Sequence, residues 1–573
     1  MFKLHKIANY MLWIFFVLLL IPTSFVVFFN STILLEWNLL SVYSTPLFFS
    51  MIFDPYGMVF SCAVIMISAN VLEFSKVYME DDKFIDRFTL LVLLFVLSMN
   101  MLIYFPHLMM LLLGWDGLGI VSFVLVIYYQ NSKSLGAGMI TALTNRIGDV
   151  MLLLAIAWTL NQGHWNIIHM WYSGENFMAL QFLCITVAAM TKSAQMPFSS
   201  WLPAAMAAPT PVSALVHSST LVTAGVFLLI RFYPFLSTFS LFCPFLLMIS
   251  VCTTIMAGLS ATTECDMKKI IALSTLSQLG FMMAALGLGM LNLAFFHMVT
   301  HAMFKALLFI CAGTMIHSFS HSQDLRWMGN SLTQLPTTAS CMMMANTALC
   351  GFPFMSGFYS KDLIIESSLF FPHNFIIMTL IMAAVGLTSF YSARFMLATV
   401  WAPMNGPTFI SMVENKYLTQ PMMILSFMSI MLGSSILWFF PMNPSTMILE
   451  PLQKIFSMAS VAVGIMVAWM LSTSSITSSS SMMNYSLFHY ASCLMWFLVP
   501  LSSQFIMKWP FFVSVMFLKL IDQSWLEYLG GQGAMKYLNS SSNFIMEYQS
   551  YNPVNFLAMS LGLTSTILLI MQL

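Results

Sequence analysis

Long apolar runs, separated by short polar segments, make up most of the chain. A helix that crosses the hydrocarbon core of a bilayer needs about 20 mostly apolar residues. On this criterion the pattern predicts about fifteen membrane spans, at 11–30, 57–73, 88–105, 107–129, 138–160, 180–198, 211–233, 241–262, 269–290, 292–317, 337–371, 375–400, 421–441, 457–473 and 553–572. The segment 486–506 is apolar enough for a further span, but Pro500 and its polar flanks argue against one.

Two of these runs are interrupted by helix-breaking residues. The first break contains Pro197, Pro203, Pro209 and Pro211, and the second is the stretch 351–357, GFPFMSG. Broken helices at membrane depth are tolerated only where they are buried in protein or line a water-filled cavity. The breaks fall at corresponding places of two five-helix halves, about 107–233 and 269–400. This placement predicts two inverted five-helix repeats of the transporter type.

The C-terminal part has a different pattern. The run 472–481 is almost entirely Ser and Thr and predicts a flexible connector. From Lys508 to Glu547 the charges are spaced along helix-compatible sequence, which predicts an amphipathic helix lying along the membrane or along a neighbouring protein. Gly530, Gly531 and Gly533 are expected to break it, and the last apolar run is expected to anchor its far end.

Composition excludes several classes of protein. The chain has 573 residues, of which 60% are hydrophobic and only 7% are charged. A soluble domain has about 25% charged residues, so a water-soluble globule is excluded. The formal net charge is zero, which leaves no basic surface for nucleic acid. The nine Cys are scattered without a C-x-x-C motif, so we expect no iron–sulfur cluster or structural zinc. The predicted fold class is an all-α polytopic membrane protein.

Several ionisable residues lie inside the apolar runs, where each costs a few kcal/mol or more and commonly marks an ion or proton pathway. Asp116 has a long apolar flank on each side. Arg146 and Asp149 are three residues apart on one helix face and can pair, either in a pathway or as a structural salt bridge. Lys192 precedes the first break. Lys361, followed by Asp362, comes directly after the second break.

Three further titratable residues, His297, His301 and Lys305, repeat every four positions. This spacing places them within about 80° on one helix face and over about 12 Å of its length, as in a proton ladder. A metal or haem site is the competing interpretation, but no H-E-x-x-H motif or third carboxylate ligand is near. His217 stands alone, and it is either a relay group or a satisfied core residue.

The motifs that carry these residues resemble one family closely. They are GWDG at 114–117, NRIGD at 145–149, KSAQ at 192–195, WLP at 201–203, PTPVSALVHSST at 209–220, STLSQLG at 274–280, HAMFKA at 301–306 and GFYSKD at 357–362. Together they resemble the mitochondrial NADH–ubiquinone oxidoreductase chain 5 family, the distal antiporter-like subunits of respiratory complex I. The amphipathic stretch and last helix resemble that family's lateral helix and its anchor.

The resemblance implies a role for each charged site. Asp116 would be the lateral acid, with Lys192 the modulated lysine beside it and His217 part of a hydrated link. Lys305 would be the central lysine, connected through His297 and His301, and Lys361 would be the terminal lysine nearest the exit. The family usually has Glu at position 116, so the shorter Asp is expected to need a water to reach Lys192.

The resemblance also implies a setting. The chain would be a multi-pass protein of the mitochondrial inner membrane that pumps protons, driven by quinone reduction elsewhere in the complex. It would hold no cofactor or metal itself, with NAD, FMN, iron–sulfur clusters and ubiquinone in other subunits. Its partners would be other membrane-arm and supernumerary subunits, including neighbouring antiporter-like subunits along the lateral helix, and membrane lipids, with cardiolipin a candidate.

Together, pattern and resemblance divide the chain into seven parts. These are N-terminal membrane helices (1–106), a first half-repeat (107–233), a connecting helix (234–268), a second half-repeat (269–400), further membrane helices with the Ser-rich linker (401–484), the lateral region (485–552) and the anchor (553–573). Two alternatives stay open: a stand-alone Mrp-like cation/proton antiporter, to which a long lateral strut is of little use, and a structural scaffold, which has no need of intramembrane charges.

Overall fold

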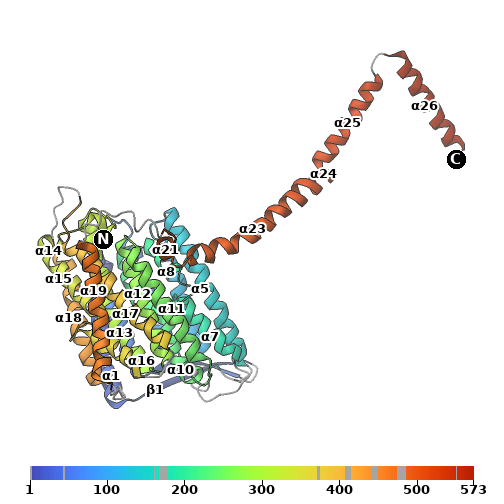
Figure 1. Cartoon of the computed structure of the whole chain (residues 1–573). Coiled ribbons are helices and arrows are strands. Elements are labelled where there is room, and N and C mark those ends of the chain that lie inside the picture. Colours follow the sequence, from blue (N-terminus) through green and yellow to red (C-terminus); the bar gives the residue numbers. More distant parts are fainter. Residues whose placement is uncertain are drawn as a thin grey trace. The chain divides into compact units, whose positions relative to one another are not determined.

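The computed structural model describes residues 3–42, 45–160, 163, 165–166, 179–370, 375–406, 414–440, 449–473, 486–549 and 552–572 (Figure 1). The chain forms two compact units, Met1–Leu498 and Val499–Leu573. Most of the predicted Ser-rich linker lies outside the described residues.

Continuous helices form most of the first unit. They are α1 (Lys3–Phe29), α2 (Pro55–Tyr78), α3 (Ile85–Tyr104), α4 (Leu108–Val126), α5 (Ser132–Thr159), α11 (Phe242–Thr263), α12 (Met267–Gly287), α13 (Leu291–Ser318), α17 (Phe375–Met396), α18 (Lys416–Phe439) and α19 (Pro451–Thr473).

The two interrupted runs are built from shorter pieces. The first contains α7 (Ala179–Lys192), α8 (Trp201–Ala204), the 3-10 helix η3 (Ala205–Ala207), α9 (Thr210–Val212), the π-helix η4 (Ser213–Thr220) and α10 (Leu221–Leu236). The second contains α15 (Pro336–Cys350), the π-helix η6 (Phe358–Asp362) and α16 (Leu363–Phe370). Short connecting helices are η5 (Leu325–Trp327), α14 (Ser331–Gln334), η7 (Leu397–Trp401), α21 (Ser486–Cys493) and α22 (Leu498–Pro500).

Among the described residues, thirteen helices are long and apolar enough to cross a membrane. They coincide with all the predicted spans except 180–198 and 337–371, which carry the helix breaks. The prediction of a polytopic helical membrane protein is confirmed, whereas the repeat relation and the seven-part division stay predictions. The doubtful segment 486–506 is not one helix, because Met495, Trp496 and Phe497 adopt positive φ values of 49°, 55° and 60°. Such left-handed backbone is costly for bulky residues and ends a helix.

The sequence analysis did not predict a β-hairpin, which follows α1. Strand β1 (Ile33–Val42) pairs with β2 (Thr45–Phe53) in antiparallel register, with Ile33 opposite Phe53 and Trp37 opposite Phe49. This stretch is rich in β-branched and aromatic residues, as strands are. The predicted spans end at residue 30 and resume at residue 57, so the hydropathy pattern left this stretch between them without a predicted element.

Burial separates central helices from peripheral ones. The apolar segments of α12 and of the run from α9 to α10 are entirely buried, and α13 is nearly so, whereas α1, α18 and α19 expose most of their surface. The exposed side chains of α1 include Ile14, Phe15 and Leu18, as expected of a helix that faces lipid. The central helices therefore form the protein interior.

A buried ion pair ties three helices together. Arg231 of α10 donates to both carboxylate oxygens of Asp54, at 2.6 and 2.8 Å, and to the carbonyl of Ile103 at the end of α3, at 3.0 Å. Asp54 is also the N-cap of α2, because it accepts a hydrogen bond from the Gly57 N–H at 3.1 Å. The pair therefore caps one helix end while it fixes two others, a bidentate geometry that only Arg supplies.

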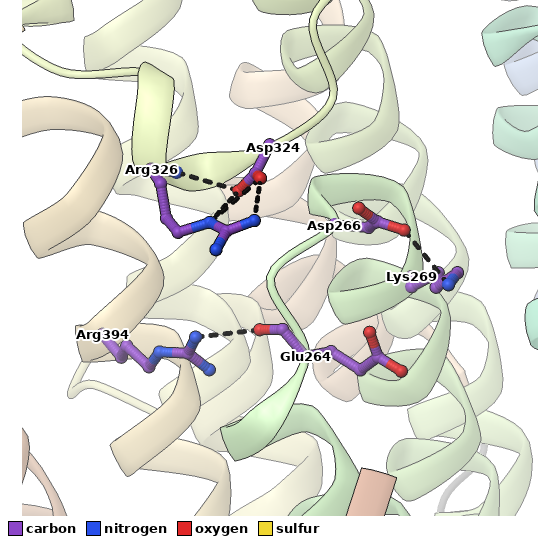
Figure 2. A network of polar contacts seen from close by, with 6 residues as sticks. All are labelled: Glu264, Asp266, Lys269, Asp324, Arg326 and Arg394. Carbon is purple, nitrogen blue, oxygen red and sulfur yellow. Dashed lines mark hydrogen bonds and ion pairs between the residues drawn. The ribbon is translucent and has the colours of Figure 1, made fainter. Parts of the chain in front are cut away.

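Polar contacts also close the ends of the central helices (Figure 2). Arg394 of α17 donates to the carbonyl of Glu264 at 2.9 Å and to that of Thr262, which caps the end of α11. Asp324 accepts from Arg326, and these hydrogen bonds lower the pKa of Asp324. Burial raises the pKa of Glu264.

The second unit is helical throughout its described part. It contains the π-helix η8 (Leu501–Phe505), α23 (Ile506–Phe517), the π-helix η9 (Leu518–Leu526), α24 (Glu527–Leu529), α25 (Gly531–Gln549) and α26 (Pro553–Gln572). The helix ends and restarts at Gly530, where the glycine run predicted a break. The side chains of Trp509, Phe511, Trp525 and Tyr528 are exposed within this unit. So many exposed aromatic groups indicate a surface that lipid or another protein covers.

The end of α7, which carries Lys192, is held by close approach of α10. A Cβ atom at Gly225 would lie 2.5 Å from the Ala189 carbonyl oxygen and 2.9 Å from the Ser193 nitrogen. No side chain fits between these two backbones, so glycine is required here by space.

We predict that Gly225→Ala lowers the thermal unfolding temperature of the detergent-solubilised protein, because overpacking costs about 1–3 kcal/mol. Gly119→Ala is the matched control: its Cβ would meet nothing within 4 Å, so the helix preference for Ala should leave stability unchanged or raise it. Equal unfolding temperatures for the two variants would contradict the close-packing argument.

Candidate functional site

The first helix break leaves backbone groups around Lys192 without hydrogen-bond partners in a regular helix. This residue is the last of α7, and its side chain is fully buried. Beyond it the chain turns, and Trp201 of α8 donates from Nε1 to the Thr191 carbonyl at 3.0 Å. Thr253 of α11 donates to Gln195 Oε1 at 2.7 Å. Side chains thus replace some of the backbone hydrogen bonds that the prolines remove.

Lys192 is held by Trp115 of α4 and not by a carboxylate. Its Nζ donates to the Trp115 carbonyl at 2.6 Å and lies 3.8 Å from the centre of the Trp115 ring, a cation–π distance. The indole Nε1 of the same tryptophan donates to Asp149 Oδ1 at 2.9 Å. Trp115 therefore stands between the lysine and Asp149. The sequence analysis did not single out Trp115, although it directly precedes Asp116.

The carboxylate of Asp116 pairs with Arg146 and, unlike that of Asp149, accepts no hydrogen bond from Trp115 among the described residues. Its carboxylate lies 4.0 Å from Arg146 Nη1, and its side chain is 31% exposed. Arg146 also pairs with Asp149 at 3.2 Å, as their i,i+3 spacing predicted. Among the described residues, Lys192 makes no ion pair with Asp116, and Asp116 Oδ1 has no hydrogen-bond partner. Arg146 and the two carboxylates thus form one cluster on α4 and α5, with Asp149 as its member next to Trp115.

His217 lies on η4, beyond the break. It is buried, and its ring centre is 6.3 Å from that of Trp201. Neither ring nitrogen has a hydrogen-bond partner among the described residues.

The predicted stripe on α13 lies in the buried centre. His297 is hydrogen-bonded on both sides, to Ser360 Oγ at 2.9 Å and to Gln278 Oε1 at 3.1 Å. The His301 ring centre is 6.1 Å from that of His297, and its nitrogens have no partner within the described part of the chain. Lys305, fully buried, donates to Ser274 Oγ at 2.5 Å. The three groups therefore share one face of α13 and differ in their polar surroundings.

The second break positions Lys361. Gly351 ends α15 with a φ of 83°, a left-handed conformation that favours glycine. Lys361, on η6, donates to Thr388 Oγ1 at 2.8 Å and to the Leu349 carbonyl at 3.4 Å. Lys361 and Asp362 line a cavity of about 220 Å³ together with Cys350 and Ser457. Both breaks thus place a buried lysine against a backbone carbonyl.

The structure adds polar residues that the sequence analysis missed. Ser274, Ser277 and Gln278 line one face of α12 at i, i+3 and i+4, and Thr388 and Tyr391 do so on α17. Hydroxyl and amide side chains inside apolar runs were the available signal, but isolated uncharged polar residues of this kind also occur in ordinary spans. Within the described residues, no group of three or more His, Cys, Asp or Glu is arranged to hold a metal ion.

The chemistry of this arrangement is that of proton transfer. Its members are amines, imidazoles, carboxylates and hydroxyls, which bind and release protons or pass them along hydrogen bonds. These side chains are carried by α4, α5, α7, α12, α13, η6 and α17, and they lie on both sides of each helix break. The fold and this row define the chain as a multi-pass membrane protein with a buried row of protonatable side chains.

Comparisons with known proteins give the family. Three sequence models match, described as "NADH-Ubiquinone oxidoreductase (complex I), chain 5 N-terminus" over 37–89, "NADH:quinone oxidoreductase/Mrp antiporter, TM" over 105–388, and "NADH dehydrogenase subunit 5 C-terminus" over 391–572. The NADH-ubiquinone oxidoreductase chain 5 of Lumbricus terrestris is 63% identical over 561 residues, which cover 98% of this chain and 97% of the relative. The Aedes aegypti protein of that name is 47% identical, covering 90% of each chain. The chain belongs to the NADH–ubiquinone oxidoreductase chain 5 family.

A solved structure supports the fold independently. A chain in the structure of the Mrp complex from Dietzia sp. DQ12-45-1b superimposes with a TM-score of 0.71 at 24% sequence identity. The match covers 85% of this chain and 57% of that chain. At this level of identity the likeness establishes the shared architecture.

Proposed function

We propose that this chain translocates protons across the mitochondrial inner membrane as a core membrane subunit of NADH–ubiquinone oxidoreductase, respiratory complex I. Electron transfer from NADH to ubiquinone elsewhere in the complex would supply the energy. The observation that carries the proposal is the row of buried lysines, Lys192, Lys305 and Lys361, none of which forms an ion pair with a carboxylate in the described part of the chain.

Unpaired buried lysines are poised to change their protonation state. An ammonium group taken out of water costs several kcal/mol unless a counter-ion compensates it. Carbonyls and hydroxyls compensate only part of this cost, so the charged and neutral forms are closer in free energy than they are in water. A charge that arrives nearby then decides which form prevails, because pairwise coupling is strong in a low-dielectric interior.

The members of the row take successive roles in this proposal. The cluster of Asp116, Arg146 and Asp149 would respond to a charge that arrives at its end of the row. Its changed electric field would then reach Lys192 across Trp115. His217 would connect Lys192 onward through water. Lys305, with His297 and His301, would hold the proton at the centre, and Lys361 with Asp362 would release it into the cavity beside them.

The remaining expectations follow from family membership. We propose that the chain holds no redox cofactor, and that NAD, FMN, the iron–sulfur clusters and ubiquinone bind to other subunits. Neighbouring antiporter-like and supernumerary subunits would pack along the lateral region 485–552, in which Trp509, Phe511, Trp525 and Tyr528 are exposed within this chain. Membrane lipids, cardiolipin among them, would cover other apolar surfaces.

A stand-alone cation/proton antiporter is the second candidate, favoured by the structural likeness to a chain of the Mrp complex. The C-terminal match to NADH dehydrogenase subunit 5 over 391–572 and the high identity to chain 5 relatives over nearly the whole chain favour the complex I subunit.

We predict that Lys305→Ala stops proton pumping by the intact complex reconstituted in vesicles, while the complex still assembles. Removal of the amine takes away the central proton carrier, and general acid–base groups contribute roughly 10²–10⁴-fold to such steps. Lys133→Ala, at an exposed position near the start of α5, is the control and should pump normally. Normal pumping by the Lys305 variant would refute the proposed central role.

We predict a larger effect from Asp149→Asn than from Asp116→Asn on NADH oxidation coupled to pumping. Asp149 accepts directly from the tryptophan that holds Lys192, whereas the ion pair of Asp116 within the described residues is with Arg146 at 4.0 Å, and its side chain is partly exposed. Both variants keep side-chain size, and their turnover is compared with and without an uncoupler. Equal rates for Asp149→Asn and the unmodified complex would remove this carboxylate from the pathway.

We predict that truncation after residue 505 reduces the amount of fully assembled complex on native gels. The truncation removes the exposed aromatic residues of α23 to α25 and the apolar helix α26, which would contact partner subunits and lipid. A three-residue truncation after Ile570 is the control. Undiminished assembly of the longer truncation would count against the lateral segment as a strut.

A further inference from the structure

A layer of buried hydroxyl groups lies between the central and terminal lysines. We propose that Tyr391 of α17 is a proton-relay residue in this layer and carries protons between the Lys305 side and the Lys361 side. The inference rests on the proposed function, because it adds a specific carrier to that pathway. Tyr391 is 2% exposed and is one of the largest buried side chains of the chain.

Contacts on the Lys305 side lead toward Tyr391 along α12. Lys305 Nζ donates to Ser274 Oγ at 2.5 Å. Ser277 follows one helical turn later, on the same face, and its hydroxyl donates to the Ser274 carbonyl at 2.9 Å. The Ser277 hydroxyl is also 3.1 Å from the Tyr391 phenol oxygen, and either group can be the donor. The tyrosine thus extends the polar face of α12 across to α17.

Contacts on the Lys361 side begin one turn from Tyr391. Thr388 precedes Tyr391 by three residues on α17, so the two side chains share a helix face. The Thr388 hydroxyl accepts from Lys361 Nζ at 2.8 Å. Ser360, next to Lys361 in sequence, accepts from the Thr300 hydroxyl at 3.1 Å and contacts His297. Tyr391 therefore stands between two sets of polar groups, each of which ends on a lysine.

The phenol is chemically suited to this position. A hydroxyl donates one hydrogen bond and accepts others at the same time, so it can take a proton on its oxygen while it gives up its own. In a complete transfer, the Lys305 ammonium loses one proton and becomes an amine, and the Lys361 amine gains one proton and becomes an ammonium. Each intervening hydroxyl or water breaks one O–H bond and forms another. No electron transfer is needed, and the hydroxyls end neutral.

A purely structural role makes a different prediction. If the Tyr391 hydroxyl only fastens α17 to α12, its removal weakens packing and leaves the transfer step unchanged. If it carries protons, its removal slows that step while the ring keeps its place. Tyr391→Phe distinguishes the two roles because it deletes only the oxygen.

The experiment compares Tyr391→Phe with the unmodified complex, reconstituted as the whole assembly in vesicles. We expect pumping per NADH oxidised to fall at least severalfold, while assembly and NADH oxidation in the presence of an uncoupler are retained. The solvent deuterium isotope effect on coupled turnover should increase, because proton transfer through the layer becomes limiting. Ser277→Ala, which removes the neighbouring hydroxyl, should cause a loss in the same direction that does not add to that of Tyr391→Phe.

Tyr104→Phe is the matched control. The Tyr104 hydroxyl is also hydrogen-bonded to a serine, Ser61, at 2.5 Å, but it lies between α2 and α3, away from the lysines. Its loss should leave pumping and the isotope effect unchanged.

Lys305→Ala, measured in parallel, separates the two levels of the proposal. If that variant stops pumping while Tyr391→Phe pumps with an unchanged isotope effect, Tyr391 is no relay and the proposed function stands. If both variants pump normally, the proposed pathway itself is refuted. A loss of pumping in Tyr391→Phe with an unchanged isotope effect would identify a structural hydroxyl and would also overturn the relay.

Discussion

The cost of placing an ammonium group in a low-dielectric interior governs this structure. An isolated buried charge is normally paired or neutralised, but the buried lysines here are compensated by neutral dipoles. Lys192 reaches the Trp115 carbonyl within α4, Lys361 reaches the Leu349 carbonyl near the end of α15, and Lys305 reaches a serine hydroxyl. The second helix break supplies the Leu349 carbonyl, since the last carbonyls of a helix have no partner within that helix. Proline and glycine in this span therefore have an electrostatic consequence as well as a conformational one.

Helix packing also helps to hold the buried ammonium groups in place. Glycine at 225 brings α10 against the end of α7, and this close contact fixes the backbone from which Lys192 extends. Arg231 with Asp54, and Arg394 at the end of α11, use full charges to secure other helix ends. Arg231 and Arg394 thus secure helix ends, whereas Lys192, Lys305 and Lys361 have no carboxylate partner among the described residues. This separation assigns structural and chemical roles to different charged residues.

Much of this organisation could be predicted from the sequence because hydropathy and proline content are strong local signals. The membrane helices and the two breaks were predicted in this way, and the Arg146–Asp149 pair was predicted from its i,i+3 spacing. Two kinds of feature could not be predicted. The β-hairpin lies between two predicted spans in a stretch to which the pattern assigned no element, and the partners of the lysines depend on which helices meet in space. Trp115, Ser274 and Tyr391 look like ordinary span residues until α4, α12 and α17 are placed against the charged groups.

Trp115 has one consequence for how the two ends of the row communicate. Its indole N–H is a donor with no lone pair to receive a proton, and its ring face covers the Lys192 ammonium. A proton on the Asp149 side therefore has no direct route through this side chain, whereas the electric field of the carboxylate crosses it. In the proposed pathway, Trp115 would therefore pass the electric field of Asp149 on to Lys192 without itself carrying a proton.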